Sequence, residues 1–526
     1  MPPGPGASLT RGTADVPQQN EEAAALLNTS APDVDARSAV FLAIKNAFTL
    51  GGALVFTWSI GLAIRVFVLP RHLGPTDFGT LNWADAFTTT LFVVLGLGME
   101  QYIRKEVAVR PAIANEFYGG SFLVRIAMTA GLLGIIVAVL LGGHRSGDVI
   151  ALVILYALTQ FAVTANGTLG AMLHAKGRVR GQSILSVVTK VVWAVGILLA
   201  IATNVGFWPY GASFLASEAI EVVVLTWLAK EHLGLVFRVD WGATKRMLLS
   251  SLPYYVAGIA TTAYGKLDVS LLEFTAGSKE VGLYGAAAQL TQLTLLITPI
   301  IGWVLTPMLA RAADRSRKEL FDHVCRSMEL ILSLAMPVSL VINLGADFWI
   351  HLIFGAPYAG AVTALRVLAT MVVLTYAAII YAMTLVMLER AWTVAWISIA
   401  GLVVNAGLNL LFVRYSVPML GEGGGGTGCA AAALGTEICV TLCMGITIGP
   451  GAFDRRSVST VARGLAVYAV VVGVHLLLGH RLGAGGALRV LVDAVLYIGL
   501  AIAVGALRPR EMLSTVREAM RKPAHA

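Results

Sequence analysis

Charged residues are scarce in this chain. Of its 526 residues, 13% are Asp, Glu, Lys or Arg, and 57% are hydrophobic. A soluble protein of this length would carry roughly a quarter charged residues. Together with a mean hydropathy of +0.78, this scarcity excludes a water-soluble globular protein.

Residues for metal or nucleotide chemistry are also few. The four cysteines form no CxxC pair and the nine histidines form no HExxH motif, so we expect neither a disulfide framework nor a metal site. No GxxxxGK[ST] motif occurs, and the nearest fragment, Gly265-Lys266, runs into Leu267. The glycine-rich run 421–426 formally fits GxGxxG, but it joins two apolar segments and follows no predicted strand, so it predicts a packing turn. We expect no cofactor.

Basic residues exceed acidic ones, 38 against 30, and give a formal net charge of +8. In a soluble protein this excess would suggest nucleic-acid binding. Here the basic residues form short clusters between apolar runs, which is typical of loops that face anionic lipid. We therefore predict that the partner is a membrane lipid bilayer and that the chain binds no nucleic acid.

Apolar stretches of about 20 residues, each long enough to cross roughly 30 Å of hydrocarbon as a helix, alternate with short polar links from residue 46 onward. This pattern predicts an all-α polytopic membrane protein with about 14 transmembrane helices. The expected spans are 46–69, 82–103, 117–142, 149–173, 182–203, 207–229, 249–272, 281–306, 327–350, 361–387, 391–413, 428–449, 460–480 and 485–506.

A faint internal repeat suggests that the spans form two lobes. GPTDFGTL, with Gly74 and Gly79, follows the first span, and GSKEVGLY, with Gly277 and Gly282, follows the seventh. Many transporters consist of two similar halves around a central pathway. The predicted parts are a disordered cytoplasmic tail (1–38), an N-lobe of helices 1–6 (39–230), a cytoplasmic linker (231–248), a C-lobe of helices 7–12 (249–450), helices 13–14 (451–507) and a cytoplasmic C-terminal tail (508–526).

The distribution of basic residues predicts the orientation of the chain. With the N-terminus inside, 24 Lys and Arg residues fall in cytoplasmic loops and the C-terminal tail, and 6 fall on the opposite side. Cytoplasmic loops are those that retain Lys and Arg. We therefore expect a multi-pass protein of the plasma or inner cell membrane with both termini cytoplasmic. No segment outside the spans exceeds 45 residues, which leaves no room for a catalytic domain and predicts a non-enzyme.

Ionisable residues inside the spans are the informative positions, because a charge near mid-membrane costs at least roughly 2.5 to 3.5 kcal/mol. At 1.5 Å per residue, Arg125 and Lys190 lie about 12 Å from the predicted cytoplasmic face, and Glu218 and Glu221 lie near the midplane. The candidate substrate-binding residues are Arg125, Lys190, Lys266, Arg366, Gln289 and Gln292. The candidate ion-coupling residues are Glu218, Glu221 and Asp268, and the candidate structural or gating residues are Arg65 and Asp85.

Structural roles compete with these assignments. Arg65 and Asp85 could pair with each other or reach the membrane interface, and Gln289 and Gln292 could join helices by hydrogen bonds. Arg489 and Asp493 are spaced i, i+4 and could pair. Lys266 and Asp268 are two residues apart and point to different helix faces, which disfavours a mutual bridge and favours a cavity role.

A series of motifs covers nearly the whole chain from residue 40 to 506. They are HLGPTDFGTLNWADAF (72–87), RKEVA (104–108), KLDVSLLEFTAGSKEVGLYGAAAQL (266–290), TPMLAR (306–311), FGAPYAGAVTALRVLA (354–369), and Asn405 and Asn409 with GTGCAAAALGTEI (426–438). In order and spacing they resemble the Wzx-like polysaccharide flippases, exporters of lipid-linked oligosaccharide within the multidrug/oligosaccharidyl-lipid/polysaccharide exporter superfamily.

The resemblance implies that the chain moves a polyprenyl-pyrophosphate-linked oligosaccharide from the inner to the outer leaflet by alternating access. Arg125 and Lys190 would then bind the pyrophosphate, and a proton or sodium ion bound at Glu218 or Glu221 would couple the motion to a gradient. Polysaccharide assembly proteins are the further partners that we expect.

Two other functions compete with this one. A multidrug or small-cation antiporter of the same superfamily predicts a more acidic cavity and typically twelve spans. A membrane glycan polymerase or ligase needs a sizeable external loop, which this sequence lacks. A purely structural scaffold would give no reason to retain so many charges within the spans.

Overall fold

The structure is a computed structural model that describes residue 52 and residues 56–100, 102–103, 114–175, 179–452, 454–482 and 486–508. All regular structure in these ranges is helical, as the sequence predicts. The predicted N-terminal tail, the RKEVA motif and residues 509–526 lie outside the described residues. The elements of the N-terminal half are η1 (Ala63–Val68, π-helical), α3 (Leu69–Phe92), η2 (Val93–Gly96), α5 (Ala114–Gly142), α6 (Gly147–Ala175), α7 (Val179–Thr203) and α8 (Trp208–Leu233).

The C-terminal half follows a non-helical link, residues 234–240, and is equally helical. Its elements are α9 (Trp241–Tyr264), α10 (Leu267–Ala276), α11 (Ser278–Thr294), η4 (Leu295–Ile297), α12 (Thr298–Arg315), α13 (Arg317–Leu344), α14 (Ala346–Ile353), η5 (Ala356–Tyr358), α15 (Ala361–Met387), α16 (Ala391–Leu420), α17 (Gly424–Ile448), η6 (Pro450–Ala452), α18 (Arg455–Leu482) and α19 (Ala487–Ala503).

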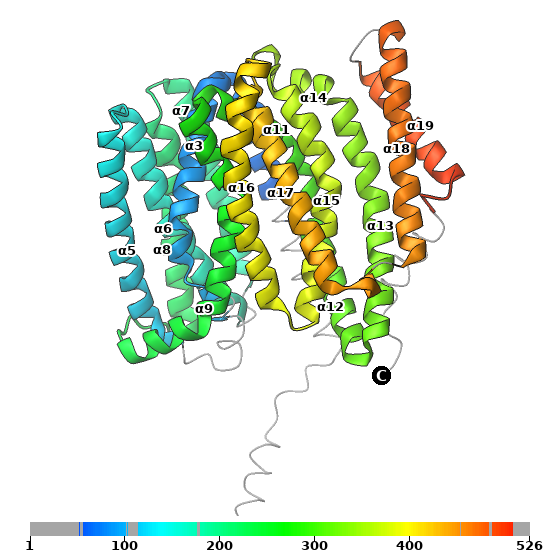
Figure 1. The fold of residues 1–526 in the computed structure, drawn as a ribbon. Helices are drawn as coiled ribbons and strands as arrows, with labels where there is room; N and C mark the ends of the chain where they lie inside the picture. Colours follow the sequence, from blue (N-terminus) through cyan, green and yellow to red (C-terminus); the bar gives the residue numbers. More distant parts are fainter. Residues whose placement is uncertain are drawn as a thin grey trace, which may run out of the picture.

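Nine helices within the described ranges are long and apolar enough to cross a membrane. They are α5, α6, α7, α8, α13, α15, α16, α17 and α18. Each overlaps a predicted span, although α13 begins before the predicted residue 327 and the predicted span 327–350 is broken at Gly345, between α13 and α14. The chain is therefore a multi-pass membrane protein. Figure 1 shows α5, α6 and α8 at one edge, α16 and α17 in the middle, and α18 with α19 at the opposite edge beside α13.

Several predicted spans are interrupted. The span predicted at 249–272 breaks at Gly265-Lys266 into α9 and α10, and the span at 281–306 breaks at η4 into α11 and α12. The helix of the second span begins earlier than the predicted residue 82, because Gly74 leaves the helical conformation and Pro75 starts a new helical stretch. A proline suits a first helical turn, where its missing N–H has no partner to lose.

The predicted repeat has a structural counterpart in two glycines. Gly74 has φ 72° and ψ 175°, and Gly277 has φ 87° and ψ 173°. This conformation is essentially restricted to glycine, because a Cβ would clash with the backbone. Each glycine precedes a helical stretch of its own half, α3 from Pro75 onward and α11. The two halves therefore repeat the same turn and helix start.

A second pair of glycines brings these two helices together. A Cβ added to Gly79 would lie 1.7 Å from the carbonyl oxygen of Ser278, and one added to Gly282 would lie 1.8 Å from that of Pro75. Helices α3 and α11 therefore touch backbone to backbone. The largest core cluster continues this interface, with Phe78 of α3 in the same cluster as Leu365 of α15.

The glycine-rich run is a packing turn, as predicted. Both carboxylate oxygens of Glu280 accept hydrogen bonds from it, one from the Gly423 N–H at 2.7 Å and one from the Gly426 N–H at 2.9 Å. A Cβ at Gly423 would lie 2.1 Å from the carbonyl oxygen of Gly360. Glu280 thus satisfies the free N–H groups at the start of α17 and fixes α17 to the start of α11.

Candidate functional site

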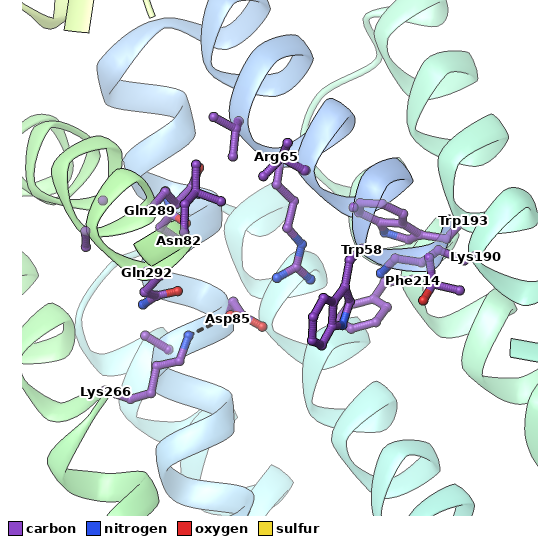
Figure 2. A pocket seen from close by; sticks show the side chains of 18 of the residues that line it. Trp58, Arg65, Asn82, Asp85, Lys190, Trp193, Phe214, Lys266, Gln289 and Gln292 are labelled. Carbon is purple, nitrogen blue, oxygen red and sulfur yellow. Dashed lines mark hydrogen bonds and ion pairs between the residues drawn. The ribbon is translucent and has the colours of Figure 1, made fainter. Parts of the chain in front are cut away.

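A cavity of about 640 Å³ lies between the two halves of the chain. Its walls come from η1, α3, α7 and α8 on one side and from α10 and α11 on the other (Figure 2). Nine of the eleven residues singled out in the sequence line it, and they are Arg65, Asp85, Lys190, Glu218, Glu221, Lys266, Asp268, Gln289 and Gln292.

Two cations share one aromatic wall of this cavity. The Lys190 ammonium lies 4.2 Å from the ring centroid of Trp193, and the Arg65 guanidinium lies 5.6 Å from the same ring and 5.9 Å from that of Phe214. Cations over ring faces are attracted by the ring quadrupole. Among the described residues, neither cation forms a salt bridge. Figure 2 shows the guanidinium of Arg65 pointing between Asp85 and Trp58.

Local backbone features place these cations. Arg65 lies in the π-helical segment η1, and such segments occur frequently at functional sites. Lys190 and Trp193 are three residues apart on α7 and therefore share a helix face. Helix periodicity on α7 therefore places Lys190 beside Trp193, and the π-helical segment η1 places Arg65 at the same wall.

The third cation of the cavity is paired. Lys266 Nζ lies 3.3 Å from Asp85 Oδ2, and the two side chains are 37% and 24% exposed. Asp85 belongs to α3 and Lys266 to the break between α9 and α10, so this ion pair joins the two halves. Asp85 thus pairs with Lys266, and no salt bridge to Arg65 is found among the described residues.

Two carboxylates lie on the α8 wall. Glu218 accepts a hydrogen bond from Asn166 Nδ2 at 2.8 Å, and Glu221 accepts one from Thr189 Oγ1 at 3.2 Å. The two residues are spaced i, i+3 and share one helix face. Donors on α6 and α7 therefore hold both carboxylates at the cavity wall.

Asp268 lies where this cavity meets a second one. Its side chain is buried, and it accepts a hydrogen bond from the Tyr284 hydroxyl. The second cavity, of about 430 Å³, has mostly apolar walls from α15, α16 and α17 but also includes Asn405 and Glu437. Asp268 and Tyr284 line both cavities.

Two predicted binding residues do not reach the cavity. Arg125 is 2% exposed, and its Nε donates to the Leu95 carbonyl oxygen at 2.8 Å. It supports the backbone where the helical turn η2 ends, because carbonyls at a helix end lack intrahelical partners. Arg366 is exposed and pairs with Asp347, so neither cation is available to a ligand in the cavity.

The expected Arg489–Asp493 pair is also not found among the described residues. Asp493 instead lies 2.6 Å from His475 Nδ1, and Arg489 donates to the His475 carbonyl oxygen. His475 belongs to α18 and the other two residues to α19. The three side chains therefore join these two helices, a contact that spacing along one helix could not predict.

Aromatic lining residues were missed by the sequence analysis. They are Trp58, Trp193, Phe214 and Tyr284. Aromatic side chains are common in apolar spans, so their type carries no signal by itself. The only available clue was proximity in sequence, since Trp193 follows Lys190 and Phe214 precedes Glu218 at helical spacing.

Polar contacts join the two halves beyond one end of the cavity. Arg145 Nη1 lies 3.0 Å from Glu273 Oε1, whose side chain is 1% exposed, and the Arg145 guanidinium lies 5.1 Å from the Trp83 ring. The Tyr358 hydroxyl donates to the Pro70 carbonyl oxygen at 2.9 Å. The cavity-lining residues of α11 begin only at Tyr284, after the Gly282 contact. This end of the interface is therefore closed.

Comparison with known proteins identifies the family. A family model described as "Polysaccharide biosynthesis protein" matches residues 43–313, which is more than half of the chain. The chain belongs to this family. The resemblance predicted from the sequence motifs is confirmed.

One curated relative of this polysaccharide biosynthesis protein is the probable low-salt glycan biosynthesis flippase Agl15 of Haloferax volcanii. The two are 22% identical over 401 residues, covering 72% of this chain and 77% of the relative. Like the solved structures below, this relative is named as a flippase or transporter and not as an enzyme. That naming agrees with the prediction of a non-enzyme.

Solved structures share the fold. The lipid II flippase MurJ in an inward closed conformation aligns with a TM-score of 0.67 at 12% identity, covering 88% of this chain and 99% of that chain. An inward-facing multidrug resistance MATE family transporter of the MOP superfamily aligns with a TM-score of 0.61 at 18% identity, covering 76% and 98%. The family member described here therefore has a MATE/MurJ-like transporter fold.

Proposed function

We propose that this polysaccharide biosynthesis protein moves a polyprenyl-pyrophosphate-linked oligosaccharide across the membrane by alternating access. Arg65 and Lys190 carry the proposal, because they face an inter-half cavity without a salt bridge among the described residues. Guanidinium and ammonium groups form strong, charge-assisted hydrogen bonds with phosphate oxygens. A pyrophosphate between them would accept such bonds from both cations.

The physics of the substrate supports this assignment. A glycan and its pyrophosphate cannot enter hydrocarbon without losing their hydration, whereas a polyprenyl chain can remain among the acyl chains. The cavity offers the side chains of Gln289 and Gln292, which line it, to sugar hydroxyls. We assign these two amides to the glycan.

Closed contacts at one end of the interface favour a state that is open toward the cytoplasm. In the predicted orientation, Arg145 and Glu273 lie on the outer side, and the cavity lies on the inner side of the Gly79–Gly282 contact. Rocking of the two halves would separate these contacts and open the cavity outward. Both termini are then cytoplasmic, the membrane is the plasma or inner cell membrane, and polysaccharide assembly proteins receive the product.

Among the three carboxylates predicted for ion coupling, Asp268 fits the role best. It is 7% exposed, lies at the junction of the two cavities and receives a hydrogen bond from Tyr284. Glu218 and Glu221 are less buried and lie beside the proposed pyrophosphate site. We therefore assign the binding of a proton or sodium ion to Asp268.

A transport assay tests the main proposal. Arg65→Gln with Lys190→Gln should lower outer-leaflet lipid-linked glycan at least about tenfold in cells that depend on this chain, since each lost charge-assisted bond costs roughly 1.5 to 3 kcal/mol. Arg366→Gln removes an exposed cation outside the cavity and should leave transport intact. Undiminished transport by a correctly inserted double variant would reject the proposal.

An antiporter of drug-like cations is the second candidate, because Asp85, Glu218, Glu221 and Asp268 line the same cavity. Carboxylates in a cavity attract organic cations. Under our proposal, expression of the chain should not reduce cellular accumulation of tetraphenylphosphonium. Efflux of that cation, lost on Glu218→Gln, would favour the antiporter.

A further inference from the structure

We propose that the cavity recognises the sugar attached directly to the pyrophosphate, and that this sugar is neutral or carries an amino group. A sugar acid is excluded by Glu218 and Glu221. The inference rests on the proposed function and names the class of its substrate.

The position of the sugar follows from the position of the pyrophosphate. A single P–O–C linkage separates the phosphate from the first sugar ring, so with the sugar-side phosphate at Lys190 the ring lies against the side chains that flank this residue. On α7 these are Ser186, Thr189 and Trp193, and on the facing helix α8 they are Phe214, Glu218 and Glu221. Helices α7 and α8 pack side by side. The sugar subsite therefore combines aromatic rings with carboxylates.

The chemistry of this wall suits a hydroxyl-rich ring. An ionised carboxylate offers about four acceptor positions. Glu218 uses one with the Asn166 side chain, and Glu221 uses two with Ser186 and Thr189. The remaining positions can accept from sugar hydroxyls or an amino group. Trp58, which lines the cavity and is 38% exposed, supplies an amphipathic face for the C–H side of the ring.

No lining cation is left to neutralise a sugar carboxylate. Among the described residues that line the cavity, the cations are Arg65, Lys190 and Lys266. The proposed pyrophosphate occupies the first two, and Asp85 already pairs with the third at 3.3 Å. A uronic acid would thus bring its charge next to Glu218 and Glu221 with no counter-charge. Two like charges about 4 Å apart weaken binding by about tenfold or more.

Defined short-chain probes test this inference on the purified full-length protein. Titration calorimetry would compare geranyl-pyrophosphate-linked N-acetylglucosamine, glucosamine and glucuronic acid, with geranyl pyrophosphate as the sugar-free probe. We expect the neutral and amino probes to bind at least about tenfold more tightly than the glucuronate. Glu218→Gln with Glu221→Gln should reduce that ratio to about threefold or less. The same variant should bind geranyl pyrophosphate at least as tightly as the wild type, because it loses two negative charges beside the pyrophosphate.

Matched variants separate this effect from a general loss of charge. Glu231→Gln removes an exposed carboxylate farther along α8 and should preserve the full ratio. Glu221→Gln alone should reduce the ratio partially. This single variant replaces the double variant in the measurement if the double variant is not monodisperse. Equal wild-type affinities for the glucuronate and neutral probes, or a ratio that survives in the glutamine variants, would overturn the inference. Failure of geranyl pyrophosphate itself to bind would instead overturn the proposed function.

Discussion

Gly79 and Gly282 contact each other's helices in the same way. Gly79 faces the Ser278 carbonyl, and Gly282 faces the Pro75 carbonyl. Ser278 and Pro75 each follow a glycine of nearly identical, glycine-restricted conformation. The interface therefore has an approximate two-fold character at its tightest point, which agrees with a transporter of two related halves.

The first prediction concerns this contact. Gly282→Ala places a methyl group 1.8 Å from the Pro75 carbonyl oxygen, so α3 and α11 must separate. Overpacking of this kind costs about 1 to 3 kcal/mol, and we expect a lower Tm in thermal unfolding of the purified protein. Gly134→Ala on α5 meets no atom within 4 Å and should leave the Tm unchanged or raise it, since alanine favours helix. An equal Tm for both variants would contradict the tight contact.

The second prediction concerns the pair of Arg145 and Glu273. Glu273→Gln removes the buried partner and should weaken the closed end by about 1 to 3 kcal/mol, because Arg145 keeps some access to water. The test uses a cysteine-free background that carries Gln292→Cys in the cavity. A membrane-impermeant maleimide added outside should label this cysteine faster when Glu273→Gln is also present than when it is absent. Glu422→Gln, which breaks the exposed pair with Lys279, is the control and should not change the labelling rate.

The third prediction concerns Asp268. Asp268→Asn removes the charge but keeps a group that can accept from Tyr284. We expect transport in reconstituted vesicles to stop responding to an imposed proton or sodium gradient, while geranyl pyrophosphate still binds. Tyr284→Phe removes only the hydroxyl donor and should weaken the response partially. A gradient response that persists in Asp268→Asn would place coupling elsewhere.

The fourth prediction separates stability from function at Lys266 and Asp85. Both side chains are partly exposed, and such pairs contribute roughly 0.2 to 1 kcal/mol. A double-mutant cycle of Lys266→Gln and Asp85→Asn, measured by unfolding, should give a coupling energy in that range. A much larger value would mean that the pair stabilises the closed interface strongly and that the conformational change must break it.

The spans and many cavity residues were predictable from the sequence, because both follow from the free-energy cost of placing polar or charged groups in hydrocarbon. Apolar length identifies a membrane helix, and charges such as Lys190 or Glu218 persist in it only where water or a partner is near. The direction of each side chain was not predictable. Arg125 is also a charge within a span, but its partner is the Leu95 carbonyl oxygen. A break in the neighbouring helix leaves that oxygen free to accept. Helix periodicity along one segment does not reveal breaks in another.

Glu280 couples the movement of α11 to that of α17. By holding the first turn of α17 while its own helix lies against α3, it makes α11 common to both the interface and the interior of the C-terminal half. A displacement that begins where α3 meets α11 is thus transmitted directly to α17. Weakening this one side chain would loosen α17 from α11 within the C-terminal half, so that a displacement at the α3–α11 contact would reach α17 less directly.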